Sequence, residues 1–212
     1  MFNFKTFNNI AEDGLDILRN NKFKEVTKDP DGILLRSHNL SKEDFEDSLL
    51  CVARAGAGTN NIPIKDATKN GIVVFNTPGA NANAVKELVV CGMLLSSRGI
   101  IEGIEFAKSL ELDNSEALNK AMEAQKKTFA GNELTGKTLG IVGLGSIGSM
   151  LAQAAHTLGM KLVGYDPYIS IEGAWRLPRE VEKAETMETL LQQSDYVSLH
   201  VPLVEATKNL IN

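Results

Sequence analysis

Cysteine is scarce in this sequence, and so are the patterns that mark secreted, membrane or metal-binding proteins. Its 212 residues include two cysteines, Cys51 and Cys91, and both lie within apolar runs, where we expect small buried side chains rather than a disulfide framework. A membrane-spanning helix needs about 20 apolar residues, and no apolar run in the sequence approaches that length. The N-terminus also lacks the basic segment followed by an apolar segment that marks a signal peptide. No residue spacing is typical of a metal site. These absences favour a cytoplasmic protein with no metal and no membrane partner.

Basic residues are also too few for a nucleic-acid surface. The chain has 22 Lys and Arg against 27 Asp and Glu, which gives a net charge of -5. Phosphate backbones are bound by clustered Lys and Arg, and the sequence has no such cluster. A hydrophobic content of 43% is ordinary for a soluble globular protein, so 212 residues suffice for one large domain or two small ones.

The stretch from Thr138 to Gly148 joins an apolar strand to a helix through a glycine-rich turn. Gly143, Gly145 and Gly148 have the spacing G-x-G-x-x-G, and apolar residues then recur with helical period up to residue 158. In such a turn the first glycine permits the bend, the second lets the backbone approach a pyrophosphate, and the third lets the helix pack on the strand. The helix N-terminus offers free N–H groups to the phosphates. The pattern therefore predicts a dinucleotide site.

An acidic residue follows the glycines at the distance that a ribose contact requires. Residues 160–165 form a second apolar run that ends at Asp166, about 20 positions past the turn. Pro167 and Tyr168 come next, with no arginine beside the carboxylate, so a 2′-phosphate would be repelled and NAD is favoured over NADP. The alternative is a purely structural turn with Asp166 as a strand cap. The order of strand, glycines, helix, strand and acid favours the cofactor.

The first 75 residues alternate between strand and helix patterns. Short apolar strands are predicted at 2–6, 23–26, 33–35, 50–53 and 72–75, with helices after residue 10, at 41–50 and after Pro63. Such alternation predicts a parallel sheet, whose ligands collect at the carboxyl ends of the strands. Polar segments stand at those ends, namely 36–37, 54–58 and 76–79.

The rest of the chain predicts a long apolar helix from Asn83, a helix at 100–110, an amphipathic helix at 113–127 and, beyond Asp166, a helix at 186–193. We therefore place one domain at 1–98 and a second at 99–212. Residues 196–200 are predicted as the third strand of the second domain, and another helix begins at Glu205. With three strands, the strand at 139–142 would have one open edge.

Several blocks together resemble the NAD-dependent D-2-hydroxyacid dehydrogenases. The matching blocks, in the order that the family has them, are 35–37, 53–61, 75–81, 143–148, 164–168 and 200–203. The resemblance implies an α/β chain, with a flavodoxin-like N-terminal substrate domain and the first part of a Rossmann-type doubly wound nucleotide domain. Within the family the resemblance is strongest to the members that reversibly oxidise 3-phosphoglycerate to 3-phosphooxypyruvate, the first step of serine biosynthesis.

The resemblance also implies the site residues. Arg36 and Ser37 would hold the anionic groups of the substrate, and Arg54 would add positive charge. The backbone of Ala55, Gly56, Ala57 and Gly58 would line the substrate carboxylate. The expected cofactor contacts are Gly143, Gly145, Ser146, Ile147, Gly148, Asp166, His200, Val201 and Pro202. Guanidinium groups suit a doubly anionic substrate, because their planar forks bind carboxylate or phosphate through two hydrogen bonds. The alternative is that either arginine is an ordinary surface cation.

Hydride transfer from an alcohol needs a base for the hydroxyl proton and a cation to polarise the carbonyl. In this family these groups are an Arg, a Glu and a His that lie beyond the third strand of the nucleotide domain, so we expect them after Asn212. His38, His156 and His200 match none of them. The sequence therefore predicts no catalytic residue in the chain, which we expect to be an inactive fragment of a longer enzyme.

Two other functions remain open at this point. One is a related dehydrogenase acting on glyoxylate, hydroxypyruvate or lactate. The other is a non-catalytic dinucleotide-binding module. The expected partners are a small anionic substrate and a second copy of the chain, since relatives pair through their nucleotide domains.

Overall fold

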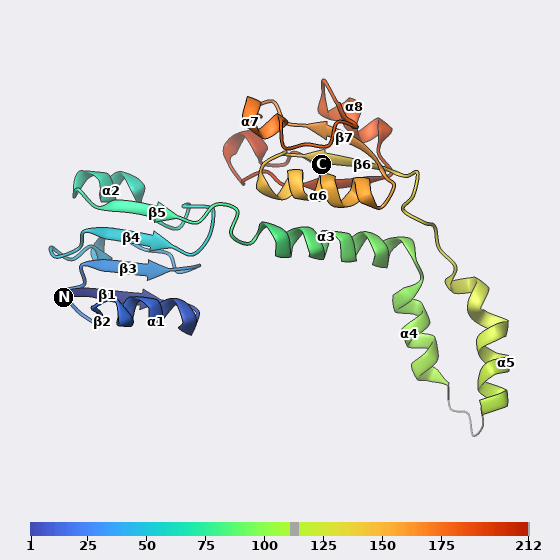
Figure 1. Cartoon of the computed structure of the whole chain (residues 1–212), viewed down its shortest axis with the longest axis horizontal. Helices are drawn as coiled ribbons and strands as arrows, with labels where there is room; N and C mark the ends of the chain where they lie inside the picture. The colour runs from blue at the N-terminus through green and yellow to red at the C-terminus, as the bar shows by residue number, and fades with distance from the viewer. Residues whose placement is uncertain (111–114, 212) are drawn as a thin grey trace. The chain divides into compact units, whose positions relative to one another are not determined.

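The computed structural model describes residues 1–110 and 115–211, which divide into two compact units. The first unit is Met1–Asn81 and the second is Ala82–Asn212 (Figure 1). Both units are built on parallel sheets with helices in the crossovers, so the predicted α/β class is confirmed.

The first unit is a five-stranded parallel sheet with strand order β2-β1-β3-β4-β5, the flavodoxin-like order. Its strands are β1 (Phe2–Phe7), β2 (Phe23–Glu25), β3 (Gly32–Leu35), β4 (Cys51–Arg54) and β5 (Val73–Asn76). The connections contain α1 (Glu12–Asn20), the short 3₁₀ helix η1 (Lys42–Asp44) and α2 (Ile64–Lys69). Each strand pairs in register with the next, for example Ile33 with Val52 and Leu35 with Arg54. The strand predictions for this unit are confirmed to within one or two residues.

One face of this sheet carries the core of the first unit. Alternate residues of a strand point to the same face, so Ile33 and Leu35 of β3 lie beside Val52 of β4, and all three are fully buried. They pack against residues of the connections on that side, which are Leu40, Leu49, Ile62, Ala67 and Ile72. This packing fixes the strand ends where the polar segments begin.

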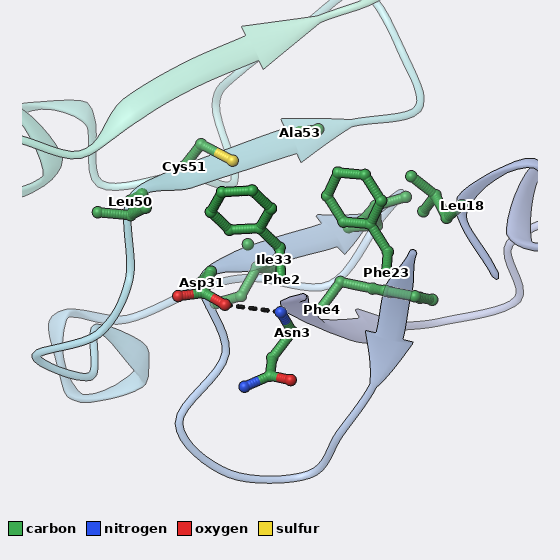
Figure 2. A pocket seen from close by; sticks show the side chains of 12 residues that line it. Phe2, Asn3, Phe4, Leu18, Phe23, Asp31, Ile33, Leu50, Cys51 and Ala53 are labelled. Atoms are coloured by element: carbon green, nitrogen blue, oxygen red, sulfur yellow. Dashed lines mark hydrogen bonds between the residues drawn. The ribbon is translucent and has the colours of Figure 1, made fainter. Parts of the chain in front are cut away.

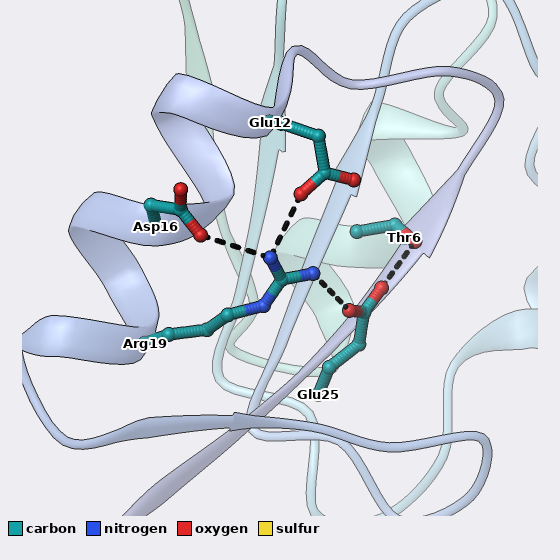
Figure 3. A network of polar contacts seen from close by, with 5 residues as sticks. All are labelled: Thr6, Glu12, Asp16, Arg19 and Glu25. Atoms are coloured by element: carbon teal, nitrogen blue, oxygen red, sulfur yellow. Dashed lines mark hydrogen bonds and ion pairs between the residues drawn. The ribbon is translucent and has the colours of Figure 1, made fainter.

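A charged network attaches α1 to β2 (Figure 3). The guanidinium of Arg19 contacts Glu12 at 2.8 Å, Asp16 at 3.1 Å and Glu25 of β2 at 3.1 Å, and Glu25 also accepts a hydrogen bond from Thr6 at 2.8 Å. The hydrogen bonds to Glu12, Glu25 and Asp16 raise the pKa of Arg19. Because the whole cluster is exposed, we assign it to local positioning rather than to ligand binding.

The second unit contains a four-stranded parallel sheet with strand order β8-β7-β6-β9. Its strands are β6 (Thr138–Val142), β7 (Lys161–Tyr165), β8 (Val181–Lys183) and β9 (Tyr196–Leu199). Its helices are α3 (Ala82–Ser97), α4 (Ile100–Ser109), α5 (Ser115–Gln125), η2 (Lys126–Phe129), α6 (Ser146–Thr157), α7 (Ile171–Ala174), α8 (Met187–Gln193) and η3 (Glu205–Thr207). The central strand β6 is the most buried, with Leu139 and Ile141 fully inaccessible.

The boundary between the units lies before α3 rather than after residue 98. Met93 of α3 belongs to the same buried cluster as Leu151 and Ala155 of α6, and α3 runs alongside α6 (Figure 1). An apolar helix joins whichever unit buries its side chains, so all of α3 belongs to the second unit.

The strand count of the second unit differs from the prediction. Residues 181–183 form an additional strand, β8, which pairs with β7, so Tyr196–Leu199 is the fourth strand and not the third. Because β9 pairs with β6, the predicted open edge beside Leu139 does not exist. The prediction missed β8 because it has three residues, two of them charged and exposed, and so lacks an apolar pattern.

Three smaller predictions are also corrected. The segment after Ser41 forms only the three-residue η1, although its predicted capping hydrogen bond from the N–H of Ser41 to Asp44 is present at 2.8 Å. The segment after Val204 forms only η3. Cys91 is exposed on α3 rather than buried, although both cysteines are free thiols as expected. The predicted helix at 113–127 is α5, and residues 113–114 lie outside the described part.

Candidate functional site

At two positions of the glycine-rich turn in the second unit, the backbone geometry allows no residue other than glycine. Gly143 has a φ of +87°, and a Cβ there would lie 2.7 Å from the carbonyl oxygen of His200. A Cβ on Gly148 would lie 2.1 Å from the carbonyl oxygen of Gly143. Side chains cannot be accommodated at these distances, so these two glycines bring β6, α6 and the end of β9 together.

Gly145 differs because a Cβ on it would meet nothing within 4 Å. It is the N-cap of α6, whose first N–H groups have no partner within the helix. A cavity of about 280 Å³ opens at this point, and its lining includes Gly145 and Ser146 of the turn and Asp166, Tyr168 and Ser170 from the segment after β7. A space at a glycine beside a helix N-terminus fits the pyrophosphate of a dinucleotide.

Asp166 lies at the end of β7 and its carboxylate is held by two backbone amides. The N–H of Leu144 donates to Oδ2 at 2.8 Å, and the N–H of Tyr168 donates to Oδ1 at 3.0 Å. Each oxygen retains a lone pair, because a carboxylate offers about four acceptor positions. The carboxylate is therefore oriented toward the cavity with acceptors left for ribose hydroxyls.

The end of β9 closes the other side of the turn. The N–H of His200 donates to the carbonyl of Val142 at 2.7 Å, and Nε2 of His200 lies 2.9 Å from Oγ of Ser198. Burial lowers the pKa of His200, so its imidazole is neutral near pH 7. A Cβ on Gly143 would lie 2.9 Å from Cγ1 of Val201, which places His200 and Val201 beside the glycines, and the cofactor contacts of residues 200–202 stay predictions.

The same cavity contains a residue that the sequence analysis missed. Arg176 lines it together with Ser146 and Asp166. The residues directly after Asp166 include no cation, whereas Arg176 returns to the site ten positions later, after α7. The sequence does show a basic residue later in the connection between β7 and β8, and this residue could have been considered as a ligand of the cofactor.

The first unit has its own cavity at the carboxyl ends of its strands. It measures about 390 Å³, and its lining includes Asn9 after β1, Arg36 after β3, Ala55 and Gly56 after β4, and Thr77 after β5. The predicted gathering of three polar segments at one edge of the sheet is present. Arg36 is the only Lys or Arg among the described residues that line this cavity.

Some backbone N–H groups near Gly56 donate to protein acceptors and others do not. The N–H of Ala55 donates to the carbonyl of Leu35 at 2.8 Å, and the N–H of Gly56 donates to Oγ1 of Thr77 at 2.8 Å. Within the described residues, the N–H groups of Ala57 and Gly58 donate to no protein acceptor. Two adjacent free N–H groups can bind an anion, although neither residue lines the cavity of Arg36, and the guanidinium beside Gly58 is that of Arg54.

Arg54 and Ser37 occupy different positions from Arg36. The guanidinium of Arg54 donates to the carbonyl of Arg36 at 3.0 Å and to Oδ1 of Asn60 at 3.3 Å, so it holds two loops in place. The N–H of Ser37 donates to Oδ1 of Asn8 at 3.0 Å. Neither residue lines the cavity with Arg36, and their roles in substrate binding stay predictions.

A second cavity of the first unit, about 370 Å³, lies against β1, β3 and β4 (Figure 2). Its wall is almost entirely apolar, with the rings of Phe2, Phe4 and Phe23 and the Cys51 thiol, and Asp31 accepts a hydrogen bond from the N–H of Asn3 at 2.6 Å. Burial raises the pKa of Cys51, which keeps the thiol protonated. Without a basic group among its lining residues, this cavity is unsuited to an anionic substrate.

The described residues contain neither a membrane-spanning helix nor a metal-binding cluster. None of their helices is both long and apolar enough to cross a bilayer. No group of three or more His, Cys, Asp or Glu residues in the same part of the chain is arranged to hold a metal ion.

Comparisons with known proteins agree with this geometry. Residues 100–212 match the family described as D-isomer specific 2-hydroxyacid dehydrogenase, NAD binding domain. The chain is 36% identical over 190 residues to D-3-phosphoglycerate dehydrogenase of Methanocaldococcus jannaschii, and this alignment covers 88% of the chain and 34% of that protein. It is also 36% identical over 198 residues to hydroxypyruvate reductase of Thermotoga maritima, covering 92% of the chain and 59% of that protein.

Solved structures show the same fold. The NAD+-bound 3-phosphoglycerate dehydrogenase of Entamoeba histolytica superposes with a TM-score of 0.68 at 28% identity, over 97% of the chain and 64% of that structure. The chain thus spans from about a third to about two thirds of the length of these relatives. Since the family match extends over more than half of the chain and includes the glycine turn and Asp166, the chain belongs to the D-isomer specific 2-hydroxyacid dehydrogenases, and its cofactor is NAD.

Proposed function

We propose that this chain is part of an NAD-dependent dehydrogenase that converts 3-phospho-D-glycerate to 3-phosphooxypyruvate in the cytoplasmic synthesis of serine. The curated relatives called D-3-phosphoglycerate dehydrogenase, in Methanocaldococcus jannaschii and Bacillus subtilis among others, support the substrate. The observation that carries the proposal is the position of Arg36, a guanidinium in the cavity at the carboxyl edge of the first sheet.

The chemistry of the substrate suits the donors around that cavity. 3-Phosphoglycerate carries a carboxylate next to its hydroxyl and a phosphate at its other end. Arg36 would pair with one anionic group in the cavity. The free N–H groups of Ala57 and Gly58, which lie outside the lining but directly follow the cavity-lining Gly56, would bind the carboxylate. NAD, when bound, accepts the hydride from C2 of the substrate. The residues of this chain bind and orient the reactants in this proposal.

The three histidines support the view that this chain does not catalyse the reaction by itself. The ring of His38 stacks on Phe7 at 4.2 Å between centroids, His156 lies 3.7 Å from Glu180, and His200 contacts Ser198. Among the described residues, none of the three lines the cavity of Arg36. We therefore propose that the 212 residues bind NAD and substrate without turning them over.

One alternative has a specific observation in its favour. The hydroxypyruvate reductase of Thermotoga maritima is as similar to the chain as the D-3-phosphoglycerate dehydrogenase of Methanocaldococcus jannaschii, each at 36% identity. A substrate without a phosphate, such as hydroxypyruvate or glyoxylate, would need only one anionic contact. A non-catalytic dinucleotide-binding role is the remaining candidate.

Calorimetric binding of 3-phosphoglycerate and of glycerate to the chain separates these possibilities. We expect 3-phosphoglycerate to bind more tightly, and Arg36→Ala to weaken its binding on the order of tenfold or more, because a charge-assisted hydrogen bond is worth roughly 1.5–3 kcal/mol. Lys65→Ala, which removes an exposed cation from α2 of the same unit, is the matched control and should have no effect.

Equal affinities for the two ligands, with or without Arg36, would favour the phosphate-free substrates. Measurable NADH production from 3-phosphoglycerate by the purified chain would contradict the proposal that it is inactive alone. Tight NADH binding with no affinity for any 2-hydroxy acid would favour the non-catalytic role.

A further inference from the structure

The phosphates of NAD carry negative charge, but the turn that faces them has no cation of its own. The residues between the three glycines are Leu144, Ser146 and Ile147, and the only basic residue of α6 is His156 in its last turn. Backbone N–H groups and the helix dipole supply only partial positive charge, about half an elementary charge at a helix N-terminus. A cation from elsewhere in the fold would add a full positive charge to this partial one.

Arg176 is the cation that the fold brings to this turn. It follows α7 in the connection from β7 to β8, and it lines the cavity of about 280 Å³ together with Gly145 and Ser146. Its backbone is fixed at both ends. The N–H of Arg176 donates to the carbonyl of Gly173 at 3.1 Å, and its own carbonyl accepts from Nε2 of Gln153 at 3.0 Å.

The anchor on Gln153 matters because Gln153 belongs to α6. The helix whose N-terminus faces the cavity therefore also holds the segment that carries the guanidinium. This arrangement keeps Arg176 at the cavity wall, although its side chain is exposed.

The guanidinium of Arg176 has no other role that the described part of the chain reveals. Across residues 1–110 and 115–211 it forms no ion pair and no side-chain hydrogen bond. Asp166 is the only acidic residue among the described residues that line the cavity with Arg176, and no ion pair joins the two side chains. The five N–H donors of the guanidinium are therefore unused by the described residues, at a cavity suited to a doubly charged pyrophosphate.

We propose that Arg176 binds the pyrophosphate of NAD and supplies the positive charge that the glycine turn lacks. This assignment rests on the cofactor site and not on the identity of the substrate, so a failure of the 3-phosphoglycerate proposal leaves it intact. Arg176 acts in binding the cofactor and takes no part in the chemical step.

Binding of NADH to the purified chain tests the proposal without any need for activity. Trp175 is the only tryptophan and adjoins Arg176, so energy transfer from its indole to the reduced nicotinamide reports binding directly. We expect Arg176→Ala to raise the Kd for NADH on the order of tenfold and to reduce its dependence on salt, whereas Arg176→Lys should keep part of the affinity. Arg98→Ala removes an exposed arginine of the same unit outside the cavity and should leave the Kd unchanged.

Competition by smaller ligands identifies the group that Arg176 contacts. ADP should displace NADH less effectively from Arg176→Ala than from the unaltered chain, whereas adenosine, which has no phosphate, should compete equally well with both. An equal loss of adenosine and ADP binding would overturn the proposal, because it would show that Arg176 only shapes the loop. A loss confined to NADPH, with NADH unaffected, would also overturn it by placing the guanidinium at the ribose 2′ position. An unchanged Kd for NADH in Arg176→Ala would do the same.

Discussion

Single residues decide which of the charged and polar groups can take part in binding. Arg36 and Arg54 occupy similar places in the sequence, since Arg36 directly follows β3 and Arg54 is the last residue of β4. In the structure only Arg36 lines the cavity, while Arg54 is committed to the carbonyl of Arg36 and to Asn60. The sequence predicted the edge of the sheet at which the site lies, but which arginine is free depends on loop contacts that no local pattern encodes.

His200 provides a residue-scale prediction about pH. Burial lowers the pKa of His200 in the folded chain below its ordinary value of about 6.5. Above pH 6.5 the imidazole is mostly neutral in both the folded and the unfolded chain, so it does not make the free energy of unfolding depend on pH. Below it the unfolded chain binds the proton first, so the folded state loses stability as the pH falls through the window between the two pKa values.

We expect His200→Gln, which keeps a group able to reach Oγ of Ser198, to lose less stability than the unaltered chain between pH 7.5 and pH 5. Urea unfolding at the two pH values measures the difference. His156→Gln is the control, because His156 is more than two-fifths exposed. Equal losses in the unaltered chain and in His200→Gln would contradict the assignment of this pH dependence to His200.

At the scale of elements, the strand, turn and helix around Gly143–Gly148 were predicted correctly because their physics is local. An apolar run, three glycines and a helical period lie within twenty residues and need no distant partner to be recognised. The strand β8 was missed for the opposite reason. Its three residues become a strand only because β7 offers a free edge beside them.

The two later glycines of this element should respond differently to a single methyl group. Gly145→Ala places its Cβ in open space, so we expect a stability change within about 1 kcal/mol but a clear loss of NADH affinity, because the methyl group occupies the space that the pyrophosphate needs. Gly148→Ala places its Cβ 2.1 Å from the carbonyl of Gly143, and we expect it to destabilise the fold by roughly 1–3 kcal/mol or more.

Thermal unfolding and NADH titration of both variants check this pair. The expected pattern is a folded Gly145→Ala that binds poorly and a Gly148→Ala with a lowered Tm. Unimpaired NADH binding by Gly145→Ala would show that the open space at this glycine is not where the cofactor lies.

At the scale of the whole molecule, the second unit exposes apolar side chains at helical spacing on α4 and on α5. Ile101 and Ile104 lie three residues apart on α4 and are 48% and 47% exposed, and Leu118 and Met122 of α5 are each 41% exposed. Residues at this spacing share a helix face, and contiguous exposed apolar patches are typical of protein interfaces. We therefore propose that the chain pairs with a second copy through α4 and α5.

Light scattering during gel filtration tests this pairing. The unaltered chain should elute with the mass of a dimer, and Ile101→Glu combined with Ile104→Glu should shift it to a monomer. Ile17→Glu introduces the same charge at an exposed isoleucine of the first unit and should leave the mass unchanged. A monomeric unaltered chain would contradict the proposal.

The sequence by itself determined the two parallel sheets, the position of the dinucleotide turn and Asp166 as its acidic partner, because periodicity, glycine stereochemistry and strand-end polarity act over short distances. Only the tertiary structure decided that β9 lies beside β6, that α3 belongs to the second unit, that Ala57 and Gly58 keep free N–H groups, and that Arg176 reaches the turn. Each of these depends on contacts between segments far apart in the chain. Once the local helices and strands have formed, the apolar surfaces that are still exposed determine which of these distant segments pack together.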